Sequence, residues 1–479
     1  GCVNIKRHAN GKEAGVNHKR NQFRCQVQKF REKIESEKLA FADSLSVRAV
    51  EGAINHLQIE FRERVYTPWV TLWLFLFQIL SRGSCADAVS RLIVDLVCRN
   101  KPPCSPQTGA YCEARSRLPE EFYQYICQTL GYDSLQQAPT EWKFFGRNVK
   151  VVDGTTVSMP ETEDNCAEFP LQYPSRAGIS FPLARLLVMF SLSVGTVLEV
   201  AISPYRGKQT GEYALLREFR KAFEPSDILL GDAGFCSYCH IVELHQRGVD
   251  SVVKAEHSRL GNLVAVKQLA KHDVLYRWPK PKGKPDTFGR SEFNALPDEI
   301  LVRLVTVRVD QPGFRTKQFD VLTTLTEHKK FRASDLANLF RRRWYAELFI
   351  RDIKVALGMD QLKCQTPEMV RKEIHAHLIA YNLVRIQIAQ AAHLAGVLPE
   401  QISFTSSLNT ILQFQAAFQQ MSKHAIACML ATISQRRVGK QPDRFEPRAV
   451  KRRQPHAMLT KPRAELRNML LENDLELTT

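Results

Sequence analysis

The amino-acid sequence predicts an α/β protein whose layered core is flanked by helical regions on both sides. Residues 41–145 carry apolar residues at helical spacing. From residue 146 the pattern changes to short apolar runs such as "NVKVVDGTTVSM", which alternate with helical segments. Residues 396–433 are helical again. Strands that alternate with helices indicate a sheet covered by helices, which is an α/β fold.

The composition limits the kind of partner that this chain binds. Its 479 residues include 67 Lys and Arg against 50 Asp and Glu, a net charge of +17. So basic a chain is typical of proteins that bind a polyanion, first of all nucleic acid. The longest apolar runs, residues 69–80 and 186–202, are too short or too often interrupted to cross a bilayer. Twelve scattered cysteines and a polar N-terminus predict a cytoplasmic protein with reduced thiols and no membrane partner.

The N-terminal part divides into an arm and a helical region. Residues 1–40 are polar and basic and are expected to form a loose arm. In the region of residues 41–145, two helices flank the turn "KPPCSPQ" and are compatible with a helix-turn-helix. Arg115 and Arg117 on its second helix would then contact DNA. An ordinary helical bundle explains the pattern equally well, so both interpretations stand.

The core is divided in the sequence by a β-rich segment. Residues 146–260 are expected to form its first part, with two buried strands that turn at Gly195. Residues 261–326 are rich in β-prone and turn residues and predict an insertion. Residues 327–395 return to helices and complete the core, and residues 396–479 form a helical C-terminal region with a basic tail.

Two predicted strands end in an acid followed by small residues. "KVVDGTT" places Asp153 at a strand end, and "ILLGDAG" places Asp232 at another. Side chains at strand ends of an α/β sheet face a shared crevice, where ligands commonly bind. Carboxylates grouped in this way suit Mg²⁺, and two such ions serve phosphoryl transfer. A single Asp of this kind is weak support, because it is often a turn residue.

The segment "LFRRRWYAELFIRDIKVALG", residues 339–358, predicts one helix with an unusual face. Arg343, Arg351 and Lys354 lie within roughly 40° of Glu347 on a helical wheel. One carboxylate is therefore flanked by three cations. Taken alone, such a face is more often a solvated, salt-bridged surface.

These residues together resemble the DDE class of bacterial insertion-sequence transposases. The resemblance is to the group with a Tyr-x2-Arg-x3-Glu-x6-Lys signature, which Arg343, Glu347 and Lys354 fit in spacing. "RWYAELFIRDIK" and "HLIAYNLVR" are similar to the family, and Asp153 and Asp232 fit its first two acids. The long segment before Glu347 fits the family's β-rich insertion into an RNase H-like, retroviral-integrase-like core.

The resemblance implies a function and a set of roles. Asp153, Asp232 and Glu347 would be the catalytic residues and would hold two Mg²⁺ ions, with Mn²⁺ as a substitute. Arg343, Lys354 and Arg351 would contact DNA. The partners would be transposon-end DNA with terminal inverted repeats and target DNA, bound by a homodimer at the bacterial nucleoid. The reaction would be cut-and-paste transposition.

One departure from the signature keeps a second function open. Phe340 occupies the Tyr position, so the phenolic hydroxyl is missing. The alternative is a catalytically inactive, transposase-derived DNA-binding protein, against which the presence of all three acids counts. A haloacid-dehalogenase-type phosphatase is excluded, because the position of its nucleophile holds Val151.

Two further patterns have ordinary explanations. "CSYCH", residues 236–240, matches a haem-attachment motif, but that chemistry requires export, so these cysteines are predicted to be thiols at the start of a helix. An apolar stripe in the C-terminal region is expected to pack within its own subunit rather than form the dimer interface. Its members are Ile411, Leu412, Phe414, Phe418 and Met421.

Overall fold

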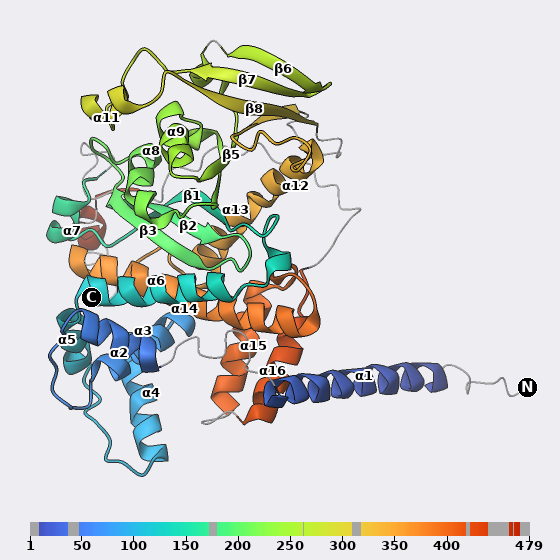
Figure 1. Cartoon of the computed structure of the whole chain (residues 1–479). Helices are drawn as coiled ribbons and strands as arrows, with labels where there is room; N and C mark the ends of the chain where they lie inside the picture. Colours follow the sequence, from blue (N-terminus) through green and yellow to red (C-terminus); the bar gives the residue numbers. More distant parts are fainter. Residues whose placement is uncertain are drawn as a thin grey trace, which may run out of the picture.

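One continuous nine-stranded sheet forms the centre of the molecule (Figure 1). The computed structural model describes residues 9–36, 47–171, 180–261, 263–308, 318–417, 422–438, 459–462 and 464–469. The strand order is β3-β2-β1-β4-β5-β9-β8-β7-β6. The strands are β1 (Val149–Ser158), β2 (Leu183–Ser191), β3 (Val197–Pro204), β4 (Ile228–Gly231), β5 (Asp250–Lys254), β6 (Val264–Ala270), β7 (Asp273–Pro279), β8 (Glu299–Arg308) and β9 (Gln318–Thr323).

The first five strands form an RNase H-like core, as predicted. β1, β2 and β3 pair antiparallel, whereas β4 pairs parallel to β1 and β5 parallel to β4. The β2–β3 connection turns at Gly195, which has a φ of +83°, a conformation that glycine adopts without a steric penalty. The predicted turn is therefore confirmed. With helices on both sides, the sheet makes the fold α/β.

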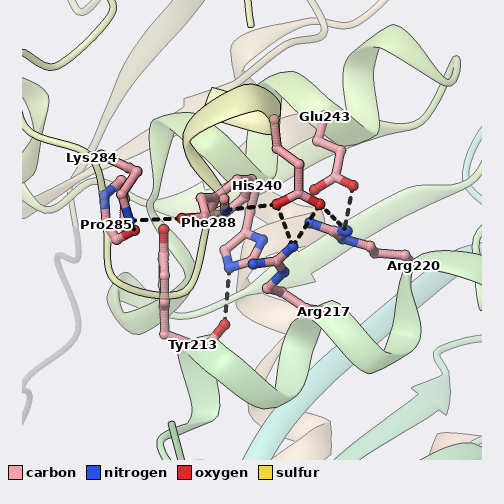
Figure 2. Close-up of polar contacts among 10 residues, drawn as sticks. Tyr213, Arg217, Arg220, His240, Glu243, Lys284, Pro285 and Phe288 are labelled. Atoms are coloured by element: carbon pink, nitrogen blue, oxygen red, sulfur yellow. Dashed lines mark hydrogen bonds and ion pairs between the residues drawn. The ribbon is translucent and has the colours of Figure 1, made fainter. Parts of the chain in front are cut away.

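The β-rich insertion extends this sheet instead of forming a separate layer. β9 pairs antiparallel with β5, and β8, β7 and β6 follow outward. Its helix α11 (Arg290–Ala295) folds back toward the core. There Glu292 accepts hydrogen bonds from Arg217 at 2.8 Å, and Arg220 forms an ion pair with Glu243 at 2.8 Å (Figure 2). The guanidinium groups also lie over the ring of Phe288, so the insertion is fastened to the core by charge and by packing.

Apolar residues alternate along β1 between the two sides of the sheet. Val151 and Val157 pack in the same cluster as α6 and α14, whereas Val152 packs in a second cluster with η3 and α9. The helices around the core are α6 (Glu120–Gln137), α7 (Glu163–Glu168), α8 (Glu212–Leu215), η3 (Leu216–Ala222), η4 (Ala233–Phe235), α9 (Tyr238–Gln246), α10 (His257–Leu260) and α14 (Pro367–Ala395).

The long helix α14 is the main support of the first cluster. It begins after Thr366, whose side chain accepts a hydrogen bond from the backbone N–H of Met369, and ends at Gly396 in the left-handed conformation. It packs on α6 and β3. Asn382 donates a hydrogen bond to the backbone oxygen of Val197 at 2.9 Å and so ties α14 to the edge of the sheet.

The N-terminal helices form a bundle below the core (Figure 1). The segment predicted as the second helix of a helix-turn-helix is broken at Leu118 and Pro119 into α5 and α6. Phe122 and Tyr123 in α6 are fully buried, so this helix packs within the protein instead of presenting a DNA-reading face. A role of residues 41–145 in DNA binding stays a prediction, but these helices pack as a bundle. Its helices are α2 (Val47–His56), α3 (Pro68–Leu80), α4 (Cys85–Cys98), α5 (Gly109–Arg117) and α6, and η1 (Thr140–Trp142) follows.

The expectation of a loose N-terminal arm was wrong. Residues 9–36 form the helix α1 (Ala9–Ser36), which lies against α16 (Lys423–Gln435). Val27, Phe30 and Ile34 are buried there at helical spacing. These three apolar residues are too few to stand out in a basic sequence, which explains the error.

The C-terminal region is helical where it is described, with η6 (Pro399–Gln401), α15 (Phe404–Ala417) and α16. Ile411 is buried, and Leu412 packs against the main core, so this part of the apolar stripe lies within its own subunit. Phe418, Met421 and most of the basic tail lie outside the described residues. Among the helices that the structure describes, none is long and apolar enough to cross a membrane.

Candidate active site

The pairing of β1 with β4 brings the first two acids together. Val151 lies beside Leu230 in this parallel pair, so two further residues along each chain reach Asp153 and Asp232. β4 ends at Gly231, as predicted. β1, however, does not end at Asp153, because its pairing with β2 continues to Ser158. Beyond Val151, β1 therefore has an open edge on the β4 side, and the two acids lie beside it.

Short local hydrogen bonds orient both carboxylates at this edge. Asp153 Oδ1 accepts a hydrogen bond from the backbone N–H of Gly154 at 2.9 Å. Asp232 Oδ1 accepts one from the backbone N–H of Gly234 at 2.7 Å and caps the short helix η4. In each carboxylate one oxygen accepts a hydrogen bond from a nearby backbone N–H. A carboxylate can accept several hydrogen bonds, so both groups can still accept others.

Glu347 reaches the same place from the C-terminal half of the chain. The segment predicted as one helix consists of α12 (Ala333–Arg342), α13 (Trp344–Arg351) and the π-helical turn η5 (Asp352–Ala356). α13 packs against β1, with Ala346 and Phe349 buried beneath it. Glu347 Oε1 accepts a hydrogen bond from Arg343 Nη2 at 2.8 Å.

The electrostatics of Asp153 reflect its burial and the charges around it. Burial is the main cause that raises the pKa of Asp153 to about 7, and the nearby carboxylates of Asp232 and Glu347 act in the same direction. The backbone N–H of Gly154 and the guanidinium of Arg343 act in the opposite direction. An acid with so perturbed a pKa beside two others is a frequent mark of a functional site.

The cations predicted near Glu347 take different positions. Lys354 Nζ donates a hydrogen bond to the backbone oxygen of Thr156 at 2.8 Å and so covers part of the open edge of β1. Burial lowers the pKa of this Lys354 amine. Arg351 is exposed and lies 3.8 Å from Asp352. Of the three predicted cations, Arg343 and Lys354 are thus tied to the acid-bearing elements, and Arg351 points to solvent.

The two arginines predicted in the N-terminal region also differ from each other. Arg115 is only 8% exposed, with its guanidinium over the rings of Phe75 and Tyr111. The prediction that Arg115 contacts DNA was therefore wrong, because its helix α5 packs into the bundle. Arg117 is exposed and forms an ion pair with Glu113 at 3.7 Å, so its DNA contact stays a prediction.

Phe340, at the Tyr position of the signature, is buried. Its ring centroid lies 5.1 Å from that of Phe319 on β9, and the Arg343 guanidinium lies 5.9 Å from the Phe340 ring. The side chain thus packs α12 onto the sheet and supports Arg343 from behind. The CxxCH cysteines, Cys236 and Cys239, are buried at the start of α9, as predicted.

Sequence reasoning missed a fourth acid, Glu212. It lies in the first turn of α8, and its carboxylate contacts the backbone at Gly154. Burial raises the pKa of Glu212, and the charge of Asp232 raises it further. The segment "TGEYALL" shows only that a helix begins here, so the sequence contains no signal for this placement.

The donors at this site suit a hard divalent cation, which prefers carboxylate oxygens. Glu347 forms an ion pair with Arg343 at 2.8 Å. Among the residues that the structure describes, no three acidic, histidine or cysteine side chains are grouped so as to hold a metal. The chemistry of the side chains and the perturbed Asp153 nevertheless fit a cation that would neutralise them.

Three comparisons with known proteins show what this chain is similar to. A family model described as "Transposase DDE domain" matches residues 144–383, half of the chain. The transposase InsG of insertion sequence element IS4 from Escherichia coli (strain K12) is 25% identical over 402 residues, covering 82% of this chain and 87% of InsG. The piggyBac transposase, in a cryo-EM structure of its synaptic complex with hairpin DNA, gives a TM-score of 0.39 at 11% identity, covering 89% of this chain and 88% of that chain. This chain therefore belongs to the DDE transposase family.

Proposed function

We propose that this protein binds the two ends of an insertion sequence, cuts them free and joins them to target DNA. The observation that supports this most strongly is the meeting of Asp153, Asp232 and Glu347, which come from three distant parts of the chain. An inactive DNA-binding descendant would have no need to keep three costly carboxylates beside one another.

The first chemical step is hydrolysis of a phosphodiester at the element end. The oxygen of water attacks phosphorus, the bond to the 3′-oxygen breaks, and that oxygen takes a proton to become a free 3′-OH. The 3′-oxygen then attacks a phosphodiester of the target and displaces a target 3′-oxygen. Both steps are in-line displacements, which one site performs by positioning and charge neutralisation.

Asp153, Asp232 and Glu347 would hold the divalent metal that DDE transposases use, two Mg²⁺ ions or Mn²⁺ in their place. The bound metal would activate the attacking oxygen and stabilise the leaving one. Arg343 would be released from Glu347 and would contact a phosphate oxygen through its planar fork. Lys354, held at the open edge of β1, and the exposed Arg351 would add charge along the DNA backbone.

The partners follow from the reaction. The ligands are terminal inverted repeats and target DNA, and the protein acts as a homodimer that holds two ends together, at the nucleoid in the bacterial cytoplasm. The net charge of +17 opposes association of free subunits. We therefore propose that dimerisation depends on DNA.

A nicking experiment tests the function. End DNA carrying the flanking inverted repeats is incubated with the protein and Mg²⁺, and release of a 3′-OH is followed on a gel. Asp153→Asn is expected to lower the cleavage rate by at least about a hundredfold while end binding, measured by mobility shift, persists. Asp298→Asn, which alters an exposed acid of the insertion, is the matched control. Normal cleavage by Asp153→Asn would contradict the proposed function.

A further inference from the structure

A cavity of about 870 Å³ lies between the N-terminal bundle and the segment of residues 357–366, which follows η5. Its other lining residues come from the second half of α3, the start of α4, from α5 and from the start of α14. The volume is in the range of sites that hold small molecules. None of the three acids of the proposed catalytic site lines this cavity.

Hydrogen bonds between distant segments hold the walls of the cavity in place. The backbone N–H of Leu362 donates to the oxygen of Ser158 at 2.9 Å, and that of Ser158 donates to the oxygen of Asp360 at 3.1 Å. These bonds attach one wall to the end of β1. On the opposite wall, Arg82 Nε donates a hydrogen bond to the backbone oxygen of Ala356 at 3.2 Å. The cavity is therefore preformed, which lowers the entropic cost of binding a ligand.

Arg115 lines this cavity as a buried cation without a counter-charge. It is only 8% exposed, and among the residues that the structure describes no carboxylate forms an ion pair with it. Its Nη2 lies 3.5 Å from Cys85 Sγ and 3.9 Å from Cys112 Sγ, which are weak acceptors, and its Nε is buried without a hydrogen-bond partner. The rings of Phe75 and Tyr111 offset part of the cost of burying this charge. An anion in the cavity would offset the remainder.

The other charges around the cavity also favour an anion. Lys363 is an exposed lining residue that forms no ion pair with another residue of the described structure. Of the two lining acids, Asp360 is exposed, and both oxygens of Glu373 already accept hydrogen bonds from the backbone N–H of Lys363 at 3.0 Å. The helices α4 and α14 both begin at the cavity, and helix N-termini attract anions. The acids in their first turns, Asp87 and Glu368, do not line it.

The chemistry of the lining indicates which anion fits. Arg115 and Lys363 together suit a phosphate monoester, which carries nearly two negative charges, better than a single carboxylate. Ile79, Leu357 and Met369 add apolar surface that a bare inorganic ion would leave uncovered. Arg115 is too deeply covered for duplex DNA, because a phosphate of the duplex would have to carry its neighbouring nucleotides into the cavity.

We propose that this cavity binds a small organic phosphate of about nucleotide size, whose phosphate group pairs with Arg115 and Lys363 and whose organic part contacts the apolar lining. This binding is separate from DNA cleavage and does not rest on the proposed function. The ligand would join the N-terminal bundle to the segment after η5, because residues of both line the cavity.

The test measures the binding of adenosine monophosphate and of inorganic phosphate to the full chain by calorimetry. A chelator is present, so that no divalent metal joins the ligand to the catalytic acids. Adenosine monophosphate is expected to bind more tightly than inorganic phosphate, because it also covers apolar surface. Succinate, a dicarboxylate, tests the choice of anion. Absence of binding by both phosphates, or tighter binding of succinate than of adenosine monophosphate, would overturn the proposal.

Two substitutions test the residues that pair with the phosphate. Arg115→Gln should weaken the binding of adenosine monophosphate by about tenfold or more, the loss expected for one charge-assisted hydrogen bond. Lys363→Ala, at an exposed position where folding is not at risk, should weaken it by about twofold to fivefold. Lys101→Ala, at an exposed site beyond the other end of α4, is the matched control and should bind as the unmodified protein does. Circular dichroism verifies that each variant is folded, and unchanged affinity in both test variants would contradict the assignment.

Alkylation of thiols locates the ligand without any substitution. Cys85 and Cys112 line the cavity, whereas Cys98, at the other end of α4, is exposed and does not. Adenosine monophosphate at ten times its dissociation constant occupies about nine-tenths of the sites and should slow alkylation of the two lining thiols by iodoacetamide about tenfold. The rate at Cys98 should stay unchanged. Mass spectrometry of the peptides measures the rates, and equal rates with and without the ligand would place it outside this cavity.

A last comparison separates this site from the binding of DNA. Saturating adenosine monophosphate should leave the mobility shift of end DNA unchanged, and Asp153→Asn should bind the nucleotide normally. Displacement of the nucleotide by end DNA, together with weaker DNA binding by Arg115→Gln, would show that the cavity takes a DNA phosphate and would overturn the proposal. Loss of DNA cleavage alone, with nucleotide binding intact, would leave it standing.

Discussion

The N-terminal bundle and the α/β core each contribute an arginine that the sequence suggested for DNA, and the two have opposite environments. Arg115 lies inside the bundle between aromatic rings, with its Nη2 3.5 Å from Cys85 Sγ. Arg343 lies beside the acids, where it pairs with Glu347 at 2.8 Å and is still partly exposed. Both side chains come from helices with basic residues in their last turn or at their end.

The difference shows that the packing of a helix determines the environment of its basic side chains. A charged side chain on a helix faces solvent, a ligand or the protein interior according to this packing, which cannot be inferred from the local sequence. A carboxylate next to a glycine after a buried strand is much more constrained, because the pairing of strands determines its position. The positions of the acids that follow strands were therefore predictable from the sequence, whereas the side of a helix that faces solvent was not.

The comparison of Arg343 with Arg115 can be tested by mutation, and the largest effect, on the rate of DNA cleavage, is expected at Arg343. In the proposed function Arg343 contacts the phosphate to be cleaved, so Arg343→Ala should lower the cleavage rate by about a hundredfold to a thousandfold. Because its ion pair is partly exposed, the melting temperature should change little. Arg343→Lys keeps the charge but not the planar fork and should recover only part of the rate. The measurement is single-turnover nicking of end DNA, and an unaffected rate would remove Arg343 from the site.

A smaller effect, on stability instead of rate, is expected at Arg115. Arg115→Ala removes the contacts with Phe75 and Tyr111 from a buried position and should lower the free energy of unfolding by about 1–3 kcal/mol. DNA affinity of the folded protein should stay unchanged. Arg117→Ala, at an exposed site of the same helix, should alter stability by less than about 0.5 kcal/mol. Denaturant titration and mobility shift measure the two properties, and a folded Arg115→Ala protein with weakened DNA binding would reverse the assignment.

The smallest of the three effects concerns the pH dependence of stability and is expected at His240, whose imidazole is buried in its neutral form. Burial lowers the pKa of His240 to about 4, so the folded protein keeps this imidazole neutral while the unfolded chain binds a proton below its usual pKa of about 6.5. The unfolded state therefore gains protons first, and stability falls as the pH decreases from about 6.5 toward 4. Between pH 6.5 and 5.5 the loss should be about 1 kcal/mol.

His240→Asn, which has no proton to gain in this range, should flatten that part of the pH profile. Hydrogen exchange in residues 284–292 reports the contact of the insertion with the core (Figure 2). Equal pH profiles for the two proteins would show that the junction does not depend on the neutral imidazole.

Much of the core was predictable from the sequence, and the reasons are local. The change in periodicity at residue 146, the turn at Gly195 and the acids after two buried strands all follow from rules about strands. The RNase H-like fold and the place of the insertion came from the resemblance to transposases. The end of β1 was expected at Asp153, whereas β1 continues to Ser158, because the antiparallel partner that extends β1 is not visible from the sequence of β1 alone.

The remaining features depend on contacts between distant segments. Glu212 lies near Asp153 only because α8 crosses over a glycine, and Phe30 of α1 finds its partner in α16, at the other end of the chain. The hydrophobic pattern of a single segment gives no sign of such a partner. Where packing of this kind decides the outcome, as it does for Arg115, inference from local sequence fails.

The position of the insertion also has a consequence for the time at which the protein becomes active during synthesis. β9, its last strand, leads directly into α12 and then to Glu347, so 115 residues separate Glu347 from Asp232. A ribosome that adds about 5–20 residues per second needs roughly 6–23 s to cover that distance. During this interval the growing chain carries Asp153 and Asp232 without the third acid. A chain released early, before α13 is made, therefore lacks Glu347, the third acid of the proposed site.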